Sequence, residues 1–276
     1  MTLATRFETT DLTPRIGTEI RATKEELLQG GLREEIRDLL EQRGVLLFRE
    51  LGFTDEEQRR FSATIGEVID QGEKGIFRVT LDRSITPQAD YLEATTFWHI
   101  DGAHDRIPTR ASVLTARVLV DSGGRFTEFA NTYAAYEDLP PEKKDWAERQ
   151  QVVHSQVYLQ SAHYTDPSPE LAAHWRTHPE QVHPLVWTHR SGRKSLLVGH
   201  TAGRIVGMHE EEGAKALAEM TAWAGQPQFV YRHHWTVGDM LIWDNTGVMH
   251  RVERYPADSG RLLSRCTLVG EEPVTA

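Results

Sequence analysis

Residues 238–250 read GDMLIWDNTGVMH, and residues 97–101, far upstream, read FWHID. Residues two apart on an extended strand point to the same face, so His99 and Asp101 can present an imidazole and a carboxylate to one metal ion. His250, which follows a strand-like run and a turn, would add a second imidazole. Two neutral nitrogens and one carboxylate on one face of an octahedron leave three positions open, which suits iron(II) that also holds an oxidisable co-substrate and dioxygen. The pattern predicts a reaction centre rather than a structural metal site.

The composition is typical of a soluble, globular protein. The chain has 276 residues, of which 39% are hydrophobic and 26% charged. This length is enough for one sizeable core, and we expect a single domain over residues 1–276 because no repeat or linker marks a boundary. No apolar run approaches the length of about 18 residues that spans a membrane, so no membrane partner is expected. The net charge of -10 offers no basic field for phosphates, which argues against nucleic acid as a partner.

Two features predict a cytoplasmic location. The first residues lack a basic and then apolar leader with a small-residue cleavage site. The single cysteine, Cys266, cannot form an internal disulfide and has no neighbouring cysteine for a thiolate metal site. Both features agree with a reducing compartment.

Helix and strand patterns alternate along the chain. Apolar residues at helical spacing predict covering helices, and short apolar runs predict strands. Helices are predicted at residues 23–28, 32–40 and 140–146, and a further helix is predicted to start at the capping signal in residues 54–57. Strands are predicted at residues 44–49, 112–120, 195–198 and 240–243. Residues 158–179, rich in His, Ser, Asp and Pro, have weak periodicity and predict a long insertion or lid.

Further motifs follow one another in a fixed order from about Gly44 to Pro273. They are residues 97–101 (FWHID), 123–131 (GGRFTEFAN), 134–136 (AAY), 183–186 (HPLV), 192–194 (GRK), 204–207 (RIVG), 243–250 (WDNTGVMH) and 261–265 (RLLSR). In this order they resemble the TauD/TfdA family of iron(II)- and 2-oxoglutarate-dependent dioxygenases. Residues 198–200 (VGH), 206–208 (VGM) and 229–235 (FVYRHHW) look closer to the aryloxyacetate branch than to the taurine branch.

The resemblance implies a fold, a reaction and cofactors. The fold is mostly β with flanking helices around a double-stranded β-helix, the jelly-roll core also found in cupins. The implied metal is Fe(2+), held by His99, Asp101 and His250, and the co-substrates are 2-oxoglutarate and dioxygen. The implied reaction hydroxylates a C–H bond of a small organic acid and releases succinate and CO2. Dimers and tetramers are common in this family, so a homo-oligomer is a further expectation.

The histidines divide into ligands and structural residues. Each ligating histidine should donate its other ring N–H to an acceptor beside the metal site. Those that we interpret as structural are His154, His163, His174, His178, His189, His209, His233 and His234.

Two arginines lie in an apolar segment near the end of the chain. Arg261 and Arg265 are four residues apart, which on a strand keeps both on one face. A buried arginine is costly unless it meets an anion, and the alternative is a pair of solvated surface charges. In the family, the position of Arg261 binds the far carboxylate of 2-oxoglutarate through two charge-assisted hydrogen bonds. Thr127 matches the family threonine that donates to the same carboxylate. Between Gly124 and Thr127, however, this chain has one residue more than the family pattern, either Arg125 or Phe126.

The substrate site is described less fully by the resemblance. Arg265 matches the arginine that faces the acidic group of the primary substrate, and its alternative role is to support the co-substrate end of the pocket. Thr95 stands where the taurine enzyme has an asparagine. Residues 69–75 (IDQGEKG), expected over the substrate, lack the histidine and aromatic residue used there, so a sulfonate is disfavoured. The aromatic residues available to line a more apolar pocket are Phe77, Tyr91 and Phe97.

Other functions stay open at this point. The same cofactors support desaturation, or C–O bond cleavage when a hydroxylated ether carbon collapses, whereas halogenation is disfavoured because Asp101 fills the halide position. A non-catalytic, cupin-like metal- or carboxylate-binding protein and a zinc hydrolase could use the same ligand types. Arg261 and Thr127 argue against both, since neither class needs a clamp for 2-oxoglutarate.

Overall fold

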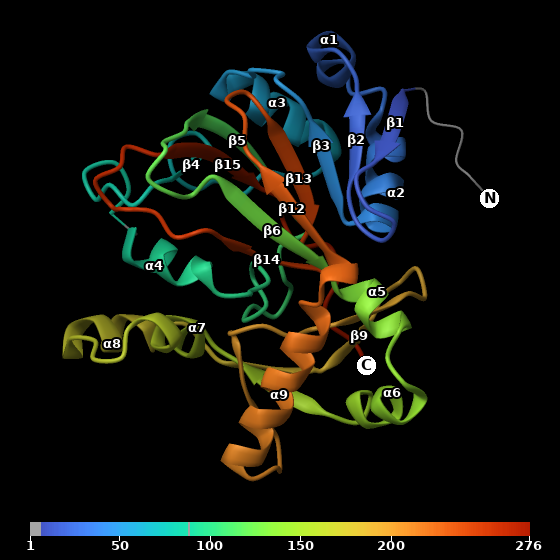
Figure 1. The fold of residues 1–276 in the computed structure, drawn as a ribbon, viewed down its shortest axis with the longest axis vertical. Helices are drawn as coiled ribbons and strands as arrows, with labels where there is room; N and C mark the ends of the chain where they lie inside the picture. Colours follow the sequence, from blue (N-terminus) through green and yellow to red (C-terminus); the bar gives the residue numbers. More distant parts are fainter. Residues whose placement is uncertain (1–6, 88) are drawn as a thin grey trace.

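Two facing β-sheets form the centre of the computed structural model, which describes residues 7–87 and 89–276 (Figure 1). The larger sheet has the strand order β1-β2-β3-β13-β5-β15-β4, and the smaller sheet has the order β12-β6-β14. Neighbouring strands in both sheets are antiparallel, apart from the parallel pair β2 and β3. The strands of the larger sheet are β1 (Glu8–Asp11), β2 (Thr18–Arg21), β3 (Val45–Phe48), β4 (Phe77–Val79), β5 (Ala111–Val118), β13 (Met240–Asp244) and β15 (Leu262–Thr267). Those of the smaller sheet are β6 (Phe126–Asn131), β12 (Val230–His234) and β14 (Val248–Val252).

Helices and two short sheets surround this centre. The short sheets are formed by β7 (Gln151–His154), β8 (Gln181–Pro184) and β11 (Ala202–Ile205), and by β9 (Val186–Thr188) and β10 (Lys194–Leu196). The helices are α1 (Lys24–Leu28), α2 (Arg33–Arg43), α3 (Asp55–Ile65), α4 (Ala89–Glu93), α5 (Thr132–Glu137), α6 (Pro141–Ala147), α7 (Gln156–His163), α8 (Pro169–Trp175) and α9 (Glu210–Ala224), with short 3-10 turns η1 (Ala94–Thr96) and η2 (Pro227–Phe229). Among the described residues, no helix is both long enough and apolar enough to cross a membrane. The predicted jelly-roll with flanking helices is confirmed.

Side chains of alternate strand residues fill the space between the two sheets. Leu47, Trp243 and Leu263 of the larger sheet pack in one buried cluster with Phe129 and Val248 of the smaller sheet. The intervening residues of the larger sheet face the other way and pack against α2 and α3, which Figure 1 shows beside that sheet. Strand β3 is therefore buried on both faces, which explains its unbroken run of apolar residues.

Side-chain caps decide where several helices begin. Thr54 forms the predicted capping box with Glu57 at the start of α3. Residues 158–179 differ from the prediction, because the structure places the end of α7 and the whole of α8 there. The hydroxyl groups of Ser155 and Ser168 accept from the main-chain N–H of Val157 and Leu171, each at 3.2 Å. Serine followed by proline, as at Ser168, is a helix-start signal that the weak apolar periodicity concealed.

The turn between β13 and β14 delivers His250 to the site. Asp244, at the end of β13, is fully buried with 0% exposure. Its Oδ1 accepts hydrogen bonds from Thr246 N at 2.9 Å and Thr246 Oγ1 at 2.6 Å, and pairs with Arg110 Nη1 at 2.5 Å. Arg110 lies just before β5, so this ion pair ties the turn to a neighbouring strand of the larger sheet.

Replacement of Arg110 by alanine should lower the free energy of unfolding by about 3 to 5 kcal/mol, because it leaves the Asp244 carboxylate buried without its counter-ion. Urea unfolding followed by circular dichroism measures this. The control is Arg125→Ala, which removes a pair with Asp121 whose side chains are 61% and 96% exposed and should cost less than about 1 kcal/mol. Equal losses in the two variants would contradict the expectation.

Candidate metal centre and active site

Reciprocal main-chain hydrogen bonds bring the two predicted histidine ligands together. His99 N donates to His250 O at 3.1 Å, and His250 N donates to His99 O at 2.8 Å. This antiparallel bridge adds the segment around His99 to the edge of β14, so that the imidazole rings lie with centroids 4.2 Å apart. Asp101 does not continue the strand, as the sequence suggested, but begins a turn.

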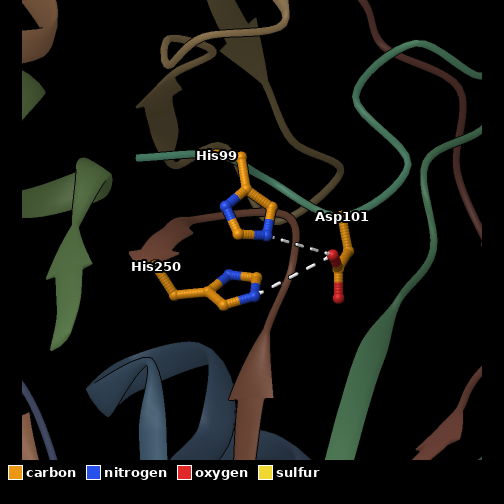
Figure 2. A group of neighbouring side chains, drawn as sticks. All are labelled: His99, Asp101 and His250. Carbon is orange, nitrogen blue, oxygen red and sulfur yellow. Dashed lines mark ion pairs between the residues drawn. The ribbon is translucent and has the colours of Figure 1, made fainter. Parts of the chain in front are cut away.

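The three side chains converge on a small volume (Figure 2). Asp101 Oδ1 lies 3.6 Å from His99 Nε2 and 3.9 Å from His250 Nε2. One ligand atom from each residue lies within 4.8 Å of the others, which is close enough for a single metal ion to bind all three. All three residues are at least nine-tenths buried.

The protonation states suit metal binding. His99 Nδ1 lies 2.8 Å from Phe97 O, and because a carbonyl can only accept, Nδ1 carries the proton and Nε2 keeps its lone pair. Burial lowers the pKa of His99 and lowers that of His250 to about 3, so both rings are neutral at neutral pH. The expectation of an N–H acceptor is met for His99 but not for His250, whose buried Nδ1 has no hydrogen-bond partner among the described residues.

The second oxygen of Asp101 is held by the protein. Oδ2 accepts from Ser112 Oγ at 3.1 Å and from Arg265 Nη1 at 3.3 Å. Burial alone would raise the pKa of the Asp101 carboxyl, but the adjacent Arg265 guanidinium and the Ser112 hydroxyl hold it well below its usual range. Asp101 is therefore an anion with Oδ1 directed at the two histidines.

A buried amide connects this carboxylate to the β13–β14 turn. Asn245 Nδ2 donates to Ser112 Oγ at 3.1 Å and to Thr109 Oγ1 at 3.0 Å. Thr109 Oγ1 in turn donates to the main-chain oxygen of Asp101 at 3.1 Å. Sequence reasoning missed Ser112 and Thr109, since nothing in a strand pattern marks a serine that faces a ligand. Asn245 lies within the motif of residues 243–250, but the motif does not indicate which residues its side chain contacts.

Arg261 is enclosed next to the Gly-Gly pair. Its Nε donates to Gly124 O at 2.8 Å, and its guanidinium lies over the Tyr255 ring at 4.5 Å. A Cβ atom at position 124 would lie 2.6 Å from both Cδ and Nε of Arg261, and Gly124 has a φ of +67°. Glycine at this position therefore makes room for the arginine. Arg261 is 2% exposed, and its Nη1 has no hydrogen-bond partner among the described residues, as expected of a cation that awaits an anion.

Thr127 is a buried hydroxyl with its proton free. It lies in β6, three residues after Gly124. Its Oγ1 accepts from Trp235 Nε1 at 2.9 Å, and because an indole N–H can only donate, the threonine hydroxyl remains a donor.

Arg265 lines a cavity of about 420 Å³ together with Asp101. Leu263 belongs to the core between the sheets, so Arg265, two residues later, starts from the inner face of β15, whereas Arg261 lies just before that strand. Phe77, whose ring lies 5.2 Å from the Arg265 guanidinium, also lines the cavity. The other lining residues are Ile69, Gln71, Pro87, Asp90, Tyr91, Gly102, His104, Asp105, Thr109, Gln156, Leu171, His174, Trp175, His178 and Thr267.

Some predicted residues lie elsewhere, and others join unexpectedly. Thr95 is not part of the cavity wall, and its hydroxyl donates to Leu92 O at 2.6 Å. Phe97 packs instead against His200, with ring centroids 4.8 Å apart. His174 and His178, which the sequence analysis interpreted as structural, both line the cavity from the α8 region.

Known proteins resemble this chain over nearly its whole length. The family described as "Taurine catabolism dioxygenase TauD, TfdA family" matches residues 8–267. An alpha-ketoglutarate-dependent 2,4-dichlorophenoxyacetate dioxygenase of Burkholderia sp. (strain RASC) is 34% identical over 271 residues, covering 88% of this chain and 89% of that protein. An alkylsulfatase of Acinetobacter baylyi (strain ATCC 33305 / BD413 / ADP1) is 30% identical, covering 94% of this chain and 84% of that protein. The crystal structure of AAD-2 in complex with Mn(II) and N-oxalylglycine superposes with a TM-score of 0.84 and 31% identity over 100% of both chains.

Replacement of Ser112 by alanine should weaken Mn(II) binding roughly 10- to 100-fold, because Asp101 Oδ2 loses the hydroxyl that orients the carboxylate. Calorimetric titration of the purified protein with Mn(II) measures the affinity without any turnover. A matched control is Ser62→Ala, since Ser62 is equally buried but its hydroxyl donates to Gln58 O within α3. The role assigned to Ser112 is rejected if its variant binds Mn(II) as tightly as the control does.

Proposed function

The chain belongs to the TauD/TfdA family of iron(II)- and 2-oxoglutarate-dependent dioxygenases, and we propose that it hydroxylates a C–H bond of a small organic acid. One observation carries the proposal. A single cavity has in its wall both Asp101, a carboxylate of the candidate metal centre, and Arg265, a cation able to meet an acid group. An acid bound to this arginine would thus have its carbon atoms next to the metal.

The donor set fits iron(II). His99 and His250 would bind it through neutral Nε2 atoms, and Asp101 through Oδ1, which leaves open positions for co-substrates. Iron held there supplies the chemistry by which dioxygen and 2-oxoglutarate yield succinate and CO2 while a substrate C–H bond is oxidised. The chain's own residues hold and orient the reactants, because the outcome depends on which C–H bond lies nearest.

Arg261 and Thr127 are proposed to bind the far carboxylate of 2-oxoglutarate. The support is the unpaired Nη1 of Arg261 and the free hydroxyl proton of Thr127. The guanidinium cannot leave its position easily, since its Nε is held by Gly124 O and one face is covered by Tyr255. A fixed donor of this kind orients the co-substrate without paying for rearrangement at each turnover.

Arg265 is proposed to bind the acid group of the primary substrate. Its Nη1 faces Asp101 Oδ2, but its Nε is buried without a hydrogen-bond partner among the described residues. Relatives include a 2,4-dichlorophenoxyacetate dioxygenase and an alkylsulfatase, and both names denote substrates with an anionic group. We propose an organic acid as the substrate of the present chain.

Arg261→Ala should weaken 2-oxoglutarate binding by about 2 to 4 kcal/mol, the scale of truncating one partner of a desolvated charge pair. Gly124→Ala should weaken it in the same direction, because the new Cβ displaces Arg261 without removing any charge. Titration of the Mn(II)-loaded protein with 2-oxoglutarate measures both. Gly260→Ala is the control, since it also has a positive φ of +75° but no atom within 4 Å of the added Cβ. Unchanged affinity in Arg261→Ala would move this role elsewhere.

The proposed reaction is tested by succinate release from 2-oxoglutarate with Fe(II) and a panel of small organic acids that includes aryloxyacetates. We expect release that depends on the acid and disappears in His250→Ala. Arg265→Ala should raise the concentration of acid required at least roughly tenfold while 2-oxoglutarate affinity stays nearly intact. The amount of oxidised acid formed per succinate should fall, because a poorly held substrate meets the oxidant less often. The proposal fails if no acid in the panel stimulates succinate release, and loss of 2-oxoglutarate binding in Arg265→Ala would assign both arginines to the co-substrate.

A further inference from the structure

Three histidines form part of the wall of the cavity that Arg265 also lines. His104 follows the ligand Asp101 within the same turn, and His174 and His178 lie at the end of α8 and just after it. The rings of His104 and His178 meet edge to face at 6.4 Å, and those of His178 and His174 at 5.7 Å. This histidine wall therefore runs from the metal centre along the cavity.

Two polar atoms of this wall have no partner. Nδ1 of His104 and Nδ1 of His178 are buried, and neither makes a hydrogen bond with any described residue. Buried polar groups in folded proteins nearly always find a partner, and an unsatisfied one is destabilising. Because the side chains of His104 and His178 line the cavity, a polar group of a bound ligand can hydrogen-bond to them.

The cavity is larger than a short acid requires. Its volume of about 420 Å³ lies within the range of roughly 300 to 1,000 Å³ that holds drug-sized ligands. A substrate whose acid group contacts Arg265 has room for further groups in the same cavity, which the histidine wall also lines. We propose that this substrate carries, at the end remote from its acid group, an uncharged hydrogen-bonding group such as a hydroxyl or a carboxamide that contacts His104 and His178, an inference that rests on the function proposed above.

The charges along the wall favour an uncharged group. Asp105 adjoins His104 in the same turn, and Asp90 also lines the cavity. A second carboxylate on the substrate would therefore meet negatively charged groups. Burial lowers the pKa of His104, and the proximity of His178 lowers it further, although Asp105 opposes this. A neutral imidazole nitrogen is a donor in one tautomer and an acceptor in the other. A hydroxyl or a carboxamide can satisfy either tautomer, whereas a carboxylate only accepts and an ammonium group only donates.

Ligand binding in the absence of turnover tests this inference. The full chain, loaded with Mn(II) and 2-oxoglutarate, is titrated calorimetrically with phenoxyacetate and with its 3- and 4-substituted hydroxy, carbamoyl and carboxy derivatives. We expect at least one hydroxy or carbamoyl derivative to bind roughly 10- to 100-fold more tightly than phenoxyacetate. His178→Phe, which keeps a ring but loses both nitrogens, should reduce that preference to about twofold, whereas His178→Gln should retain part of it.

The matched control is His209→Phe, the same substitution at an exposed histidine outside the cavity wall, which should leave the preference unchanged. The inference is overturned if no polar derivative binds better than phenoxyacetate, if the carboxy derivatives bind best, or if the preference survives His178→Phe. Tight binding of a polar derivative without succinate release on Fe(II) would support the histidine subsite and reject the proposed reaction on such acids. Succinate release without any preference would do the reverse.

Discussion

The site depends on one pair of main-chain hydrogen bonds, those exchanged between His99 and His250. They join two segments that are far apart in the sequence, and they require no particular side chain. Once the backbones are paired, both imidazoles stand side by side on the edge of the smaller sheet. The fold around the site can be understood as support for this pairing. Strand β6 holds β14, the Asp244 turn fixes where β14 begins, and the core between the sheets holds β6 against the larger sheet.

Burial makes each charge in the site dependent on a partner. Asp101 lies among two neutral histidines and would tend to be protonated there, yet Arg265 and Ser112 keep it anionic. Arg261 has no carboxylate partner within the described chain, and burial lowers its pKa. The site therefore contains one charge that has partners, that of Asp101, and one without a carboxylate partner among the described residues, that of Arg261, which match the proposed binding of a metal and of an anion. A buried cation without a counter-ion is a liability in a structural core, which makes sense when a ligand supplies the missing charge.

The sequence predicts these features unevenly, for physical reasons. Capping boxes and apolar periodicity are local, so α3 and the central strands could be located from sequence alone. The convergence of His99 and His250 could be expected only from motif order, since the pairing of distant strands leaves no local signal. The contacts of Gly124 and Ser112 could not be inferred from the sequence, because these residues meet Arg261 and Asp101 across the fold. For the same reason, the sequence did not disclose that His174 and His178 line the cavity.

The metal centre and the histidine wall are joined by a short turn. Asp101 opens this turn and His104 follows three residues later, so the position of one constrains the other. Gly102 between them has a φ of +76°, and a Cβ there would lie 2.8 Å from Thr109 N. Thr109 also donates to the main-chain oxygen of Asp101. The Asp101 end of the turn is therefore held by Thr109. The α8 side of the wall belongs to no strand of the two main sheets. If the histidine wall binds substrate as proposed, substitutions in α8 will change substrate preference while the ligand turn keeps its geometry.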